Sequence, residues 1–443
     1  MQWKAARYRT LCAVLAIMLL AVGCAAPPVP TPQPPSAADV AWLGTLQALT
    51  AGETTLAVTA EAPGTSWAEP GREAAVLTVW LDGAYAGDIV LFMGAEPHDY
   101  GFALGPVQAG PHTVLLAPAA DKGAIAPVRV SDVQLTTYGP QDALYPVLRH
   151  SPLIYGRPAM NRSDTPLLAY HERAEAGGGT TISYTVIFSN EDGGTNPPAL
   201  MARWGRVTDI EWVYSVTLDA AGNRVADEIQ AGGHRTVPFG GERRGEHPLL
   251  RVATENNMVS DSGGSRLLFA PVFAEALPAE CPREAVMDSH PWSYRVMAEE
   301  RRREGMEVPG NAATPNVSDP RNYLYVTYKA RLDPGACAPR LAAAVYDSAA
   351  GAWYTSDHDD PSMRVSLDGW RRMAIELPPG IRAEQLARLQ LCAYGDSACS
   401  VGIEAVGPVF LLDEAYRPGA LLWTWQGSQV LGAGGASELT LGR

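Results

Sequence analysis

The sequence lacks the short motifs that identify many enzyme classes. It contains no GxSxG nucleophile elbow, no HExxH zinc motif, no P-loop and no dinucleotide-binding fingerprint. His171-Glu172 is not followed by the second histidine that a zinc-hydrolase helix needs. These absences exclude the classes that such motifs define. They do not exclude a glycosidase, which needs only two well-placed carboxylates.

Basic residues are scarce. Lys and Arg together number 34 against 48 Asp and Glu, and the formal net charge is −14. Nucleic acid and anionic lipid surfaces are bound by clustered Lys and Arg, so the composition disfavours both as direct partners. Hydrophobic residues make up 47% of the 443 residues. This share excludes a disordered chain and supports cores in roughly two to four domains.

The one long apolar run lies near the N-terminus. Three basic residues between positions 4 and 9 precede Leu11–Val22, which is too short to span a membrane as a mature helix but is typical of a signal peptide. The run ends at Ala21-Val22-Gly23-Cys24, which resembles the lipobox of bacterial lipoproteins, although that family prefers Leu where this chain has Ala21. The resemblance implies that residues 1–23 are removed and that Cys24 is diacylated, which anchors the chain to a membrane. The alternative is an ordinary secretory signal followed by an unrelated cysteine.

Residues 24–38 predict a tether. Proline favours the extended polyproline II conformation, so this segment should form a semi-rigid stalk, or a disordered linker with the same consequence. At roughly 3.1 Å per residue it would hold the ectodomain up to about 40 Å from the lipid. Loss of the three basic residues of the signal peptide changes the formal charge from −14 to −17. The tether contains six prolines: Pro27, Pro28, Pro30, Pro32, Pro34 and Pro35.

Only six cysteines are present. Cys12 leaves with the signal peptide and Cys24 accepts lipid, so four remain for the ectodomain. An even number of cysteines in an oxidising compartment predicts disulfides. No CxxC or paired-histidine spacing supports the alternative of a zinc site.

The expected pairs are Cys392–Cys399 and Cys281–Cys337. Leu389–Tyr394 predicts a strand, and the short turn after it would bring Cys399 back beside Cys392. The second pair would then join the middle region to the last one.

The ectodomain pattern predicts a mainly β fold with several modules. Short strands separated by Gly and Pro indicate a β-sandwich over residues 40–140. Residues 145–308 predict a central β-rich domain with one helix, and residues 309–443 resemble a jelly-roll or galactose-binding-like sandwich. The clearest predicted strands are 76–81, 89–93, 112–116 and 128–137, then 181–188, 210–218, 225–229, 249–253 and 266–272, and finally 323–328, 341–346, 373–377, 389–394 and 409–412.

The predicted helix follows His290. Pro291 occupies its first position and Gly305 ends it. Its inward face should carry Tyr294, Val296 and Met297. Its charged run, residues 299–304, should form a solvated face.

Four polar residues of the middle region are the candidate catalytic group. Asp209 and Glu211 point to the same face of a strand, where they could act as an acid/base pair or as ligands of a hard metal. His234 and His247 follow in the sequence. The alternative is structural: the two carboxylates would pair with Arg203 and Arg206, and the histidines would lie in turns.

The same residues carry a family resemblance. Asp209-Ile210-Glu211-Trp212, then His234, then His247–Ala253 is similar to a pattern in the family called vacuolar protein sorting-associated protein 62. That family shows Asp-Trp-Glu on a strand, a later His, and His-Pro before a strand that ends in Ala. In this chain Ile210 stands in the tryptophan position, and Asn257 stands where a further His is expected. The resemblance implies a β fold and no defined reaction.

Two acidic loops and several tryptophans are further candidates. Asp357–Asp360 and Asn190–Asn196 could bind calcium through oxygen ligands, although solvated turns are the simpler interpretation. No other cofactor is indicated. Trp67, Trp353 and Trp370 fall near predicted loops, where they could stack against sugars, but most tryptophans bury their large area in a core.

These features favour an anchored protein with an extracytoplasmic binding role, most simply towards carbohydrate or a cell-envelope polymer. The alternatives are a hydrolase that uses Asp209, Glu211, His234 and His247, and a structural or scaffold lipoprotein.

Replacement of Cys24 by Ala tests the anchor. The variant has no thiol to acylate, so it should leave the membrane fraction or retain its signal peptide. Membrane fractionation with mass spectrometry of the N-terminus measures both outcomes. Unchanged processing and retention would contradict a lipid anchor at Cys24.

Overall fold

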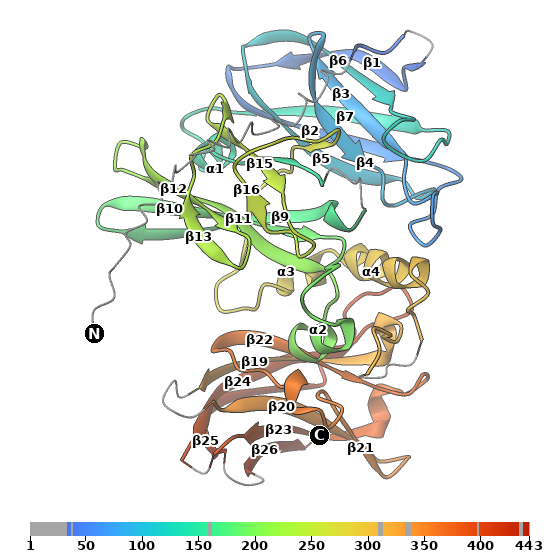
Figure 1. Ribbon diagram of the computed structural model, residues 1–443, viewed down its shortest axis with the longest axis vertical. Helices are drawn as coiled ribbons and strands as arrows, with labels where there is room; N and C mark the ends of the chain where they lie inside the picture. The colour runs from blue at the N-terminus through green and yellow to red at the C-terminus, as the bar shows by residue number, and fades with distance from the viewer. Residues whose placement is uncertain are drawn as a thin grey trace, which may run out of the picture.

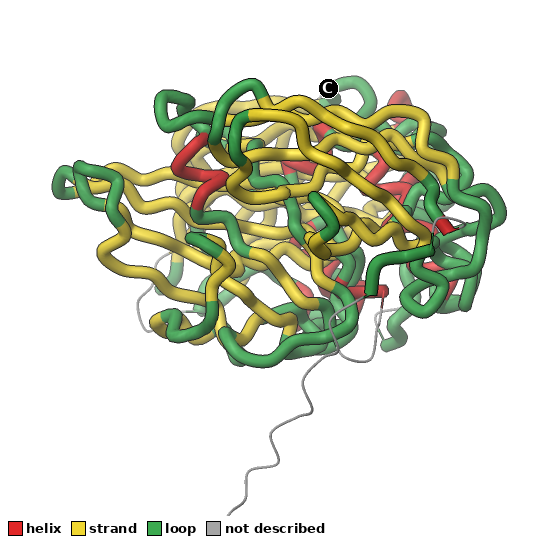
Figure 2. Tube along the Cα trace, turned by 90° about the horizontal axis from the view of Figure 1, so that it is seen from above, coloured by secondary structure: helices red, strands yellow, loops and turns green. Residues whose placement is uncertain are grey.

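The computed structural model describes residues 33–36, 39–157, 162–308, 313–332, 338–396, 398–433 and 437–442. The predicted signal peptide, Cys24, most of the predicted tether and Cys337 lie outside these residues. Strands account for 49% of the fold and helices for 11%, which confirms the predicted mainly β class. Figure 1 shows three β-rich modules one above the other, and Figure 2 shows that helices occur only as short segments between strands.

The first module is a sandwich of two sheets, one of four strands and one of three. A turn at Asp82-Gly83 joins two adjacent strands, and both residues have positive φ, as a tight hairpin requires. The four-stranded sheet has the order β1 (Trp42–Ala48), β6 (Gly110–Pro118), β3 (Val76–Leu81) and β4 (Ala84–Val90). The three-stranded sheet has the order β5 (His98–Val107), β2 (Gly52–Glu61) and β7 (Arg129–Tyr138).

The central region contains two mixed sheets and short helices. The six-stranded sheet has the order β13 (Arg235–Pro238), β12 (Arg224–Ala231), β11 (Asp209–Leu218), β10 (Gly179–Phe188), β9 (Pro166–Ala176) and β18 (Glu275–Ala276). The second sheet has the order β14 (Arg243–Arg244), β15 (His247–Val252), β8 (Leu153–Tyr155) and β17 (Leu268–Phe269), and β16 (Val259–Ser260) pairs with β15. The helices are α1 (Tyr145–Arg149), α2 (Pro197–Trp204), α3 (Ala285–Ser289) and α4 (Trp292–Arg303).

The last module is a sandwich of two antiparallel four-stranded sheets. One has the order β22 (Gly369–Glu376), β19 (Tyr323–Leu332), β24 (Ser400–Leu411) and β25 (Trp423–Gly432). The other has the order β21 (Ala352–Thr355), β20 (Arg340–Asp347), β23 (Leu386–Tyr394) and β26 (Ser437–Gly442).

The predicted cysteine pairs are wrong. Cys392 lies on β23, but the chain after the turn enters β24, which belongs to the opposite sheet, so the expected hairpin does not form. Cys392 and Cys281 both carry free thiols. Burial raises the pKa of the Cys392 thiol to about 11, which keeps it protonated at neutral pH. Cys399 is disulfide-bonded, but to neither of these two residues.

Most buried apolar residues of the described chain belong to two large clusters and to a smaller one that connects modules. One large cluster is continuous from Leu56 in the first sandwich to Phe273 in the central region. The other belongs to the last sandwich and runs from Leu324 to Leu439. Between them, a cluster that includes Tyr294 and Tyr325 joins the central helices to the last sandwich.

Helix α4 begins and ends close to the predicted positions. Pro291 directly precedes it, and Gly305 follows its end with a positive φ of 68°, where the absence of a Cβ avoids strain. Tyr294, Val296 and Met297 are buried, as predicted. Figure 1 shows α4 between the first and last modules, at the edge of the central region.

The charged run of α4 is not the solvated face that the sequence predicted. Glu300 is completely buried and Arg301 is 2% exposed. The Trp67 indole N–H donates to Glu300 (2.6 Å), and Arg303 forms an ion pair with the same carboxylate. Arg301 donates to the Asn190 side-chain carbonyl at 2.7 Å. Each burial is possible because another element supplies a polar partner.

Arg302 extends these contacts to the last sandwich. Its guanidinium lies 3.0 Å from the Asp319 carboxylate and donates to the Tyr416 hydroxyl at 2.7 Å. One helix is therefore bonded through its side chains to all three modules.

No helix among the described residues has the length and apolar character needed to cross a bilayer.

Replacement of Glu300 by Ala tests the importance of these buried contacts. The change leaves Arg303 without its buried carboxylate and the Trp67 N–H without an acceptor, so the free energy of unfolding should fall by about 3–5 kcal/mol. Urea denaturation followed by tryptophan fluorescence measures the loss. Glu299→Ala is the matched control, because Glu299 forms one partly exposed contact of 4.0 Å with Arg295 and should cost no more than about 1 kcal/mol. Equal losses in the two variants would contradict the stabilising role of the buried Glu300 contacts.

Candidate functional site

Three of the four residues of the predicted catalytic group come together. Asp209 starts β11 and accepts a hydrogen bond from the Asn257 amide at 3.0 Å. Glu211 accepts a hydrogen bond from Gln230 and lies 4.0 Å from His234 Nδ1. The His234 side chain is 62% exposed, so solvent reaches this end of the group.

The two carboxyl groups are electrostatically unusual. Burial raises the pKa of Asp209 well above its ordinary value, and the nearby carboxylates of Glu211 and Glu191 raise it further. Burial also raises the pKa of Glu211, while Gln230 and His234 oppose that shift. Paired carboxyl groups of this kind can hold and exchange a proton, which is chemistry that an acid/base site needs.

His247 does not join this group. Its Nε2 atom lies 3.2 Å from the Glu53 carboxylate of the first sandwich, and its Nδ1 atom lies 2.8 Å from the Ser151 carbonyl. Both His247 and Glu53 are buried. The structure therefore gives His247 a place at the contact between the first sandwich and the central region.

The structural alternative for Asp209 and Glu211 is also incomplete. Arg206 forms its ion pair with Glu284 at 3.2 Å, although it is close enough to lower the pKa of both carboxyl groups. Arg203 donates to the carbonyl of Ser362. The expected salt bridges to Asp209 and Glu211 are absent among the described residues.

The acidic loops use their carboxylates within the protein. Asp357 accepts from Arg364 at 2.6 Å, and Asp360 accepts from the Ser362 amide at 2.8 Å. In the other loop, Asp192 forms an ion pair with Arg157. Within the described ranges, no group of three or more His, Cys, Asp or Glu is placed to hold a metal ion.

The three candidate tryptophans have different environments. Trp67 is fully buried, so it is a core residue and cannot stack against a ligand. Trp370 donates its indole N–H to Glu280 at 2.9 Å. Trp353 is 38% exposed and packs against Tyr346, with 5.2 Å between the ring centroids.

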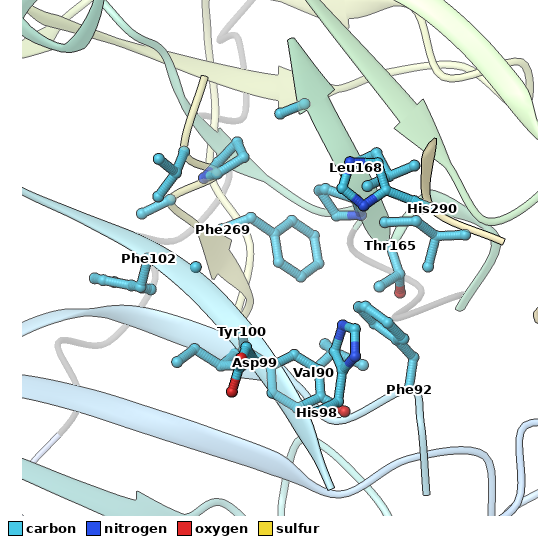
Figure 3. A pocket seen from close by; sticks show the side chains of 18 of the residues that line it. Val90, Phe92, His98, Asp99, Tyr100, Phe102, Thr165, Leu168, Phe269 and His290 are labelled. Carbon is cyan, nitrogen blue, oxygen red and sulfur yellow. The ribbon is translucent and has the colours of Figure 1, made fainter. Parts of the chain in front are cut away.

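A cavity of about 350 Å³ lies between the first sandwich and the central region, and we call it the aromatic pocket. This volume falls within the range of about 300–1,000 Å³ that is usual for small-molecule sites. Figure 3 shows Phe92, His98 and Tyr100 on one side of it, with Phe269, Leu168 and His290 on the other. Its aromatic lining consists of Phe92, His98, Tyr100, Phe102, Phe269, His290 and Trp292.

The rings of this lining pack across the contact between the modules. Phe92 stacks on Trp292, the first residue of α4, with 5.1 Å between centroids and an angle of 20° between the ring planes. His98 meets Trp292 edge to face at 4.8 Å and Phe92 at 5.5 Å. Such geometries are favourable for aromatic pairs, and they fix the positions of the rings.

Carboxylates and imidazoles complete the lining. His290 Nε2 lies 2.8 Å from the Glu275 carboxylate, and Asp99 accepts from the Thr59 hydroxyl at 2.5 Å. Burial lowers the pKa of His98 to about 4, so its ring is neutral at pH 7. The pocket thus combines apolar ring surfaces with a few fixed hydrogen-bonding groups.

The sequence pattern did not predict this pocket, although it contains one signal for it. His98, Tyr100 and Phe102 occupy alternate positions of β5, so they share one face of the strand. An apolar alternation of this kind equally predicts a core face. Only the fold shows that the opposing surface comes from residues 165–169, 269–275 and 290–292.

Comparisons with known proteins give only distant similarity. No family model matches the chain, and no curated protein matches it significantly. The resemblance to the vacuolar protein sorting-associated protein 62 family stays a prediction.

Three solved structures illustrate the distant similarity. The C-terminal domain of EclA, a sugar-binding protein, has 19% identity and a TM-score of 0.17 over 22% of this chain and 67% of that one. NLPPya in complex with mannosamine has 14% identity and a TM-score of 0.22 over 40% of this chain and 85% of that one. A Pleurotus ostreatus lectin in complex with GalNAc has 11% identity and a TM-score of 0.12 over 88% and 84%. Similarity at this level identifies neither a shared fold nor a shared ligand.

The lowered pKa of His98 predicts a pH dependence of stability. The pKa of His98 is about 4 in the folded protein and near 6.5 in the unfolded chain, so the unfolded chain binds the proton more readily. The contribution of His98 to the free energy of unfolding is therefore complete above pH 6.5 and is lost as the pH falls towards 4. The loss should reach at most about 3 kcal/mol. Replacement of His98 by Phe should remove this pH-dependent contribution. Between pH 7 and pH 4, the free energy of unfolding should therefore fall more for the wild type than for the variant.

His112→Phe is the control, measured by the same urea titrations. A hydrogen bond to Asp82 raises the pKa of His112, so its contribution has the opposite sign. Parallel pH profiles for wild type and the His98 variant would contradict the prediction.

Proposed function

We propose that this protein is a lipid-anchored extracytoplasmic protein that binds carbohydrate in the aromatic pocket. The observation that carries the proposal is the stack of Phe92 on Trp292 with His98 beside it, at the wall of a cavity of small-molecule size. The signal peptide and Cys24, which the sequence predicts, support an extracytoplasmic location.

The chemistry of the lining suits a sugar. A pyranose ring has apolar C–H faces, which pack on aromatic rings, and a rim of hydroxyl groups. The carboxylates of Asp99 and Glu275 can accept hydrogen bonds from hydroxyl groups, and the neutral His98 ring avoids the cost of burying a charge. Each carboxylate has one partner within the protein, His290 for Glu275 and the Thr59 hydroxyl for Asp99, and each keeps further lone pairs that can accept from a sugar hydroxyl.

The pocket is formed by elements whose relative positions are fixed. Trp292 is the first residue of α4, whose buried charged residues bond to the first sandwich and the central region. A preformed site loses less conformational entropy when it binds a ligand.

Trp292→Ala tests the site. Removal of the stacked indole should weaken binding by at least about tenfold, because buried aromatic residues dominate binding energies. A glycan array identifies the sugar, and calorimetry then compares the variants. Trp292→Phe keeps an aromatic ring at this position and should retain part of the affinity. Binding by this variant would show that substitution at position 292 leaves α4 in place.

The matched control is Trp353→Ala, which removes a partly exposed tryptophan of the last sandwich and should leave the affinity unchanged. Absence of binding to every glycan, or equal losses in the Trp292 and Trp353 variants, would refute the proposal.

A further inference from the structure

A second and larger cavity lies beside the first sandwich. Its volume is about 780 Å³, and residues from the first sandwich, the central region and the tether line it. We call it the basic pocket because it contains three cations in a protein of net charge −14: Lys122, Arg244 and Arg266.

Two of these cations already have carboxylate partners. Lys122 lies 2.7 Å from Asp88, and this buried pair stands between the two cavities because Asp88 lines the aromatic pocket. Arg266 forms an ion pair with Asp121, which also lines the basic pocket.

Arg244 is the third cation. It donates to the backbone carbonyl of Ala86 at 2.9 Å and, among the described residues, has no carboxylate within ion-pair distance. The three cations and two carboxylates therefore leave a surplus of one positive charge. Because Arg244 is exposed, its guanidinium can reach a ligand without moving a buried group.

Aromatic rings form one wall of the basic pocket. Tyr85 packs against Trp80 with 5.6 Å between ring centroids, and the Lys122 ammonium lies 4.8 Å above the Tyr85 ring. Tyr155 lines the same cavity and is half-buried. These rings provide an apolar surface next to the cations.

We propose that the basic pocket binds an anionic saccharide, meaning a sugar that carries a carboxylate or a phosphate group. Arg244 and Arg266 hold the anionic group, since a guanidinium matches carboxylate and phosphate oxygens. Tyr85 and Tyr155 face the sugar ring. An anionic membrane surface fits less well, because the cations line a concave cavity and the acidic charge of the whole protein opposes a broad anionic surface.

The ligand class differs from that of the aromatic pocket, so this inference goes beyond the proposed function. Neutral sugars and Trp292→Ala test the aromatic pocket separately, and a failure here leaves that test intact.

The experiment is calorimetry on the full-length protein in detergent. The probes are an oligosaccharide of glucuronic acid, a phosphorylated oligosaccharide, a neutral glucose oligosaccharide and detergent micelles that contain phosphatidylglycerol. At least one anionic oligosaccharide should bind more tightly than the neutral one, and added sodium chloride should weaken that binding. Arg244→Gln should reduce the affinity by at least tenfold. Because Arg244 is exposed, the melting temperature of this variant should stay close to that of the wild type.

The matched control is Arg235→Gln. Arg235 is also exposed and also donates to a backbone carbonyl, that of Gly232 at 3.1 Å, but it lies outside the basic pocket. Its substitution should leave the affinity unchanged. The proposal is overturned if neither anionic sugar binds, if the neutral sugar binds equally well and loses as much affinity in Arg244→Gln, if Arg235→Gln weakens binding as much as Arg244→Gln, or if only the phosphatidylglycerol micelles bind.

Discussion

The placement of the three modules depends on charged side chains of helix α4, two of which are buried. A buried carboxylate or guanidinium is tolerated only where polar partners meet it, and each of these charges finds partners on a different element. The buried Glu300 is bound by Trp67 of the first sandwich and the buried Arg301 by Asn190 of the central region, while the exposed Arg302 pairs with Asp319 at the start of the last module. A change in the position of any module would leave a charge without its partner.

The aromatic pocket follows from this arrangement. Phe92 and His98 belong to the first sandwich, whereas Trp292 begins the same helix whose later residues carry the buried charges. The pocket therefore exists only while the two modules keep their relative position. A second group with unusual chemistry, Asp209 and Glu211, lies within the central region, and the raised pKa of both carboxyl groups keeps acid/base chemistry there open.

Features that depend on local sequence could be predicted, and features that depend on distant contacts could not. Alternating apolar residues specify strands, so β10 and β11 lie where the sequence indicates. The start of α4 is likewise encoded by Pro291. The burial of Glu300 depends on Trp67, which is far away in the sequence. The local pattern of charges around Glu300 therefore does not indicate this burial. The cysteine pairing failed for a related reason, because β23 and β24 are consecutive in the chain but belong to different sheets.

The candidate site shows the same limit. Strand alternation placed Asp209 and Glu211 together, but it could not show that His247 pairs with Glu53 of another module. The contacts of His247 with Glu53, of Glu300 with Trp67 and of Arg302 with Asp319 each join different modules, and the sequence alone does not reveal which modules touch.

The continuous core of the first sandwich and the central region has a consequence for how the protein responds to force. Because Leu56 and Phe273 belong to one buried cluster, a pull transmitted through the tether would act on both modules as a single elastic body. The last sandwich has its own core and meets that body through the helices, by a smaller apolar cluster and by polar side chains such as Arg302. Under load, the contacts between this layer of helices and the last sandwich would break first, and the aromatic pocket, whose Trp292 begins α4 and packs on the shared core, would stay with the first sandwich and the central region.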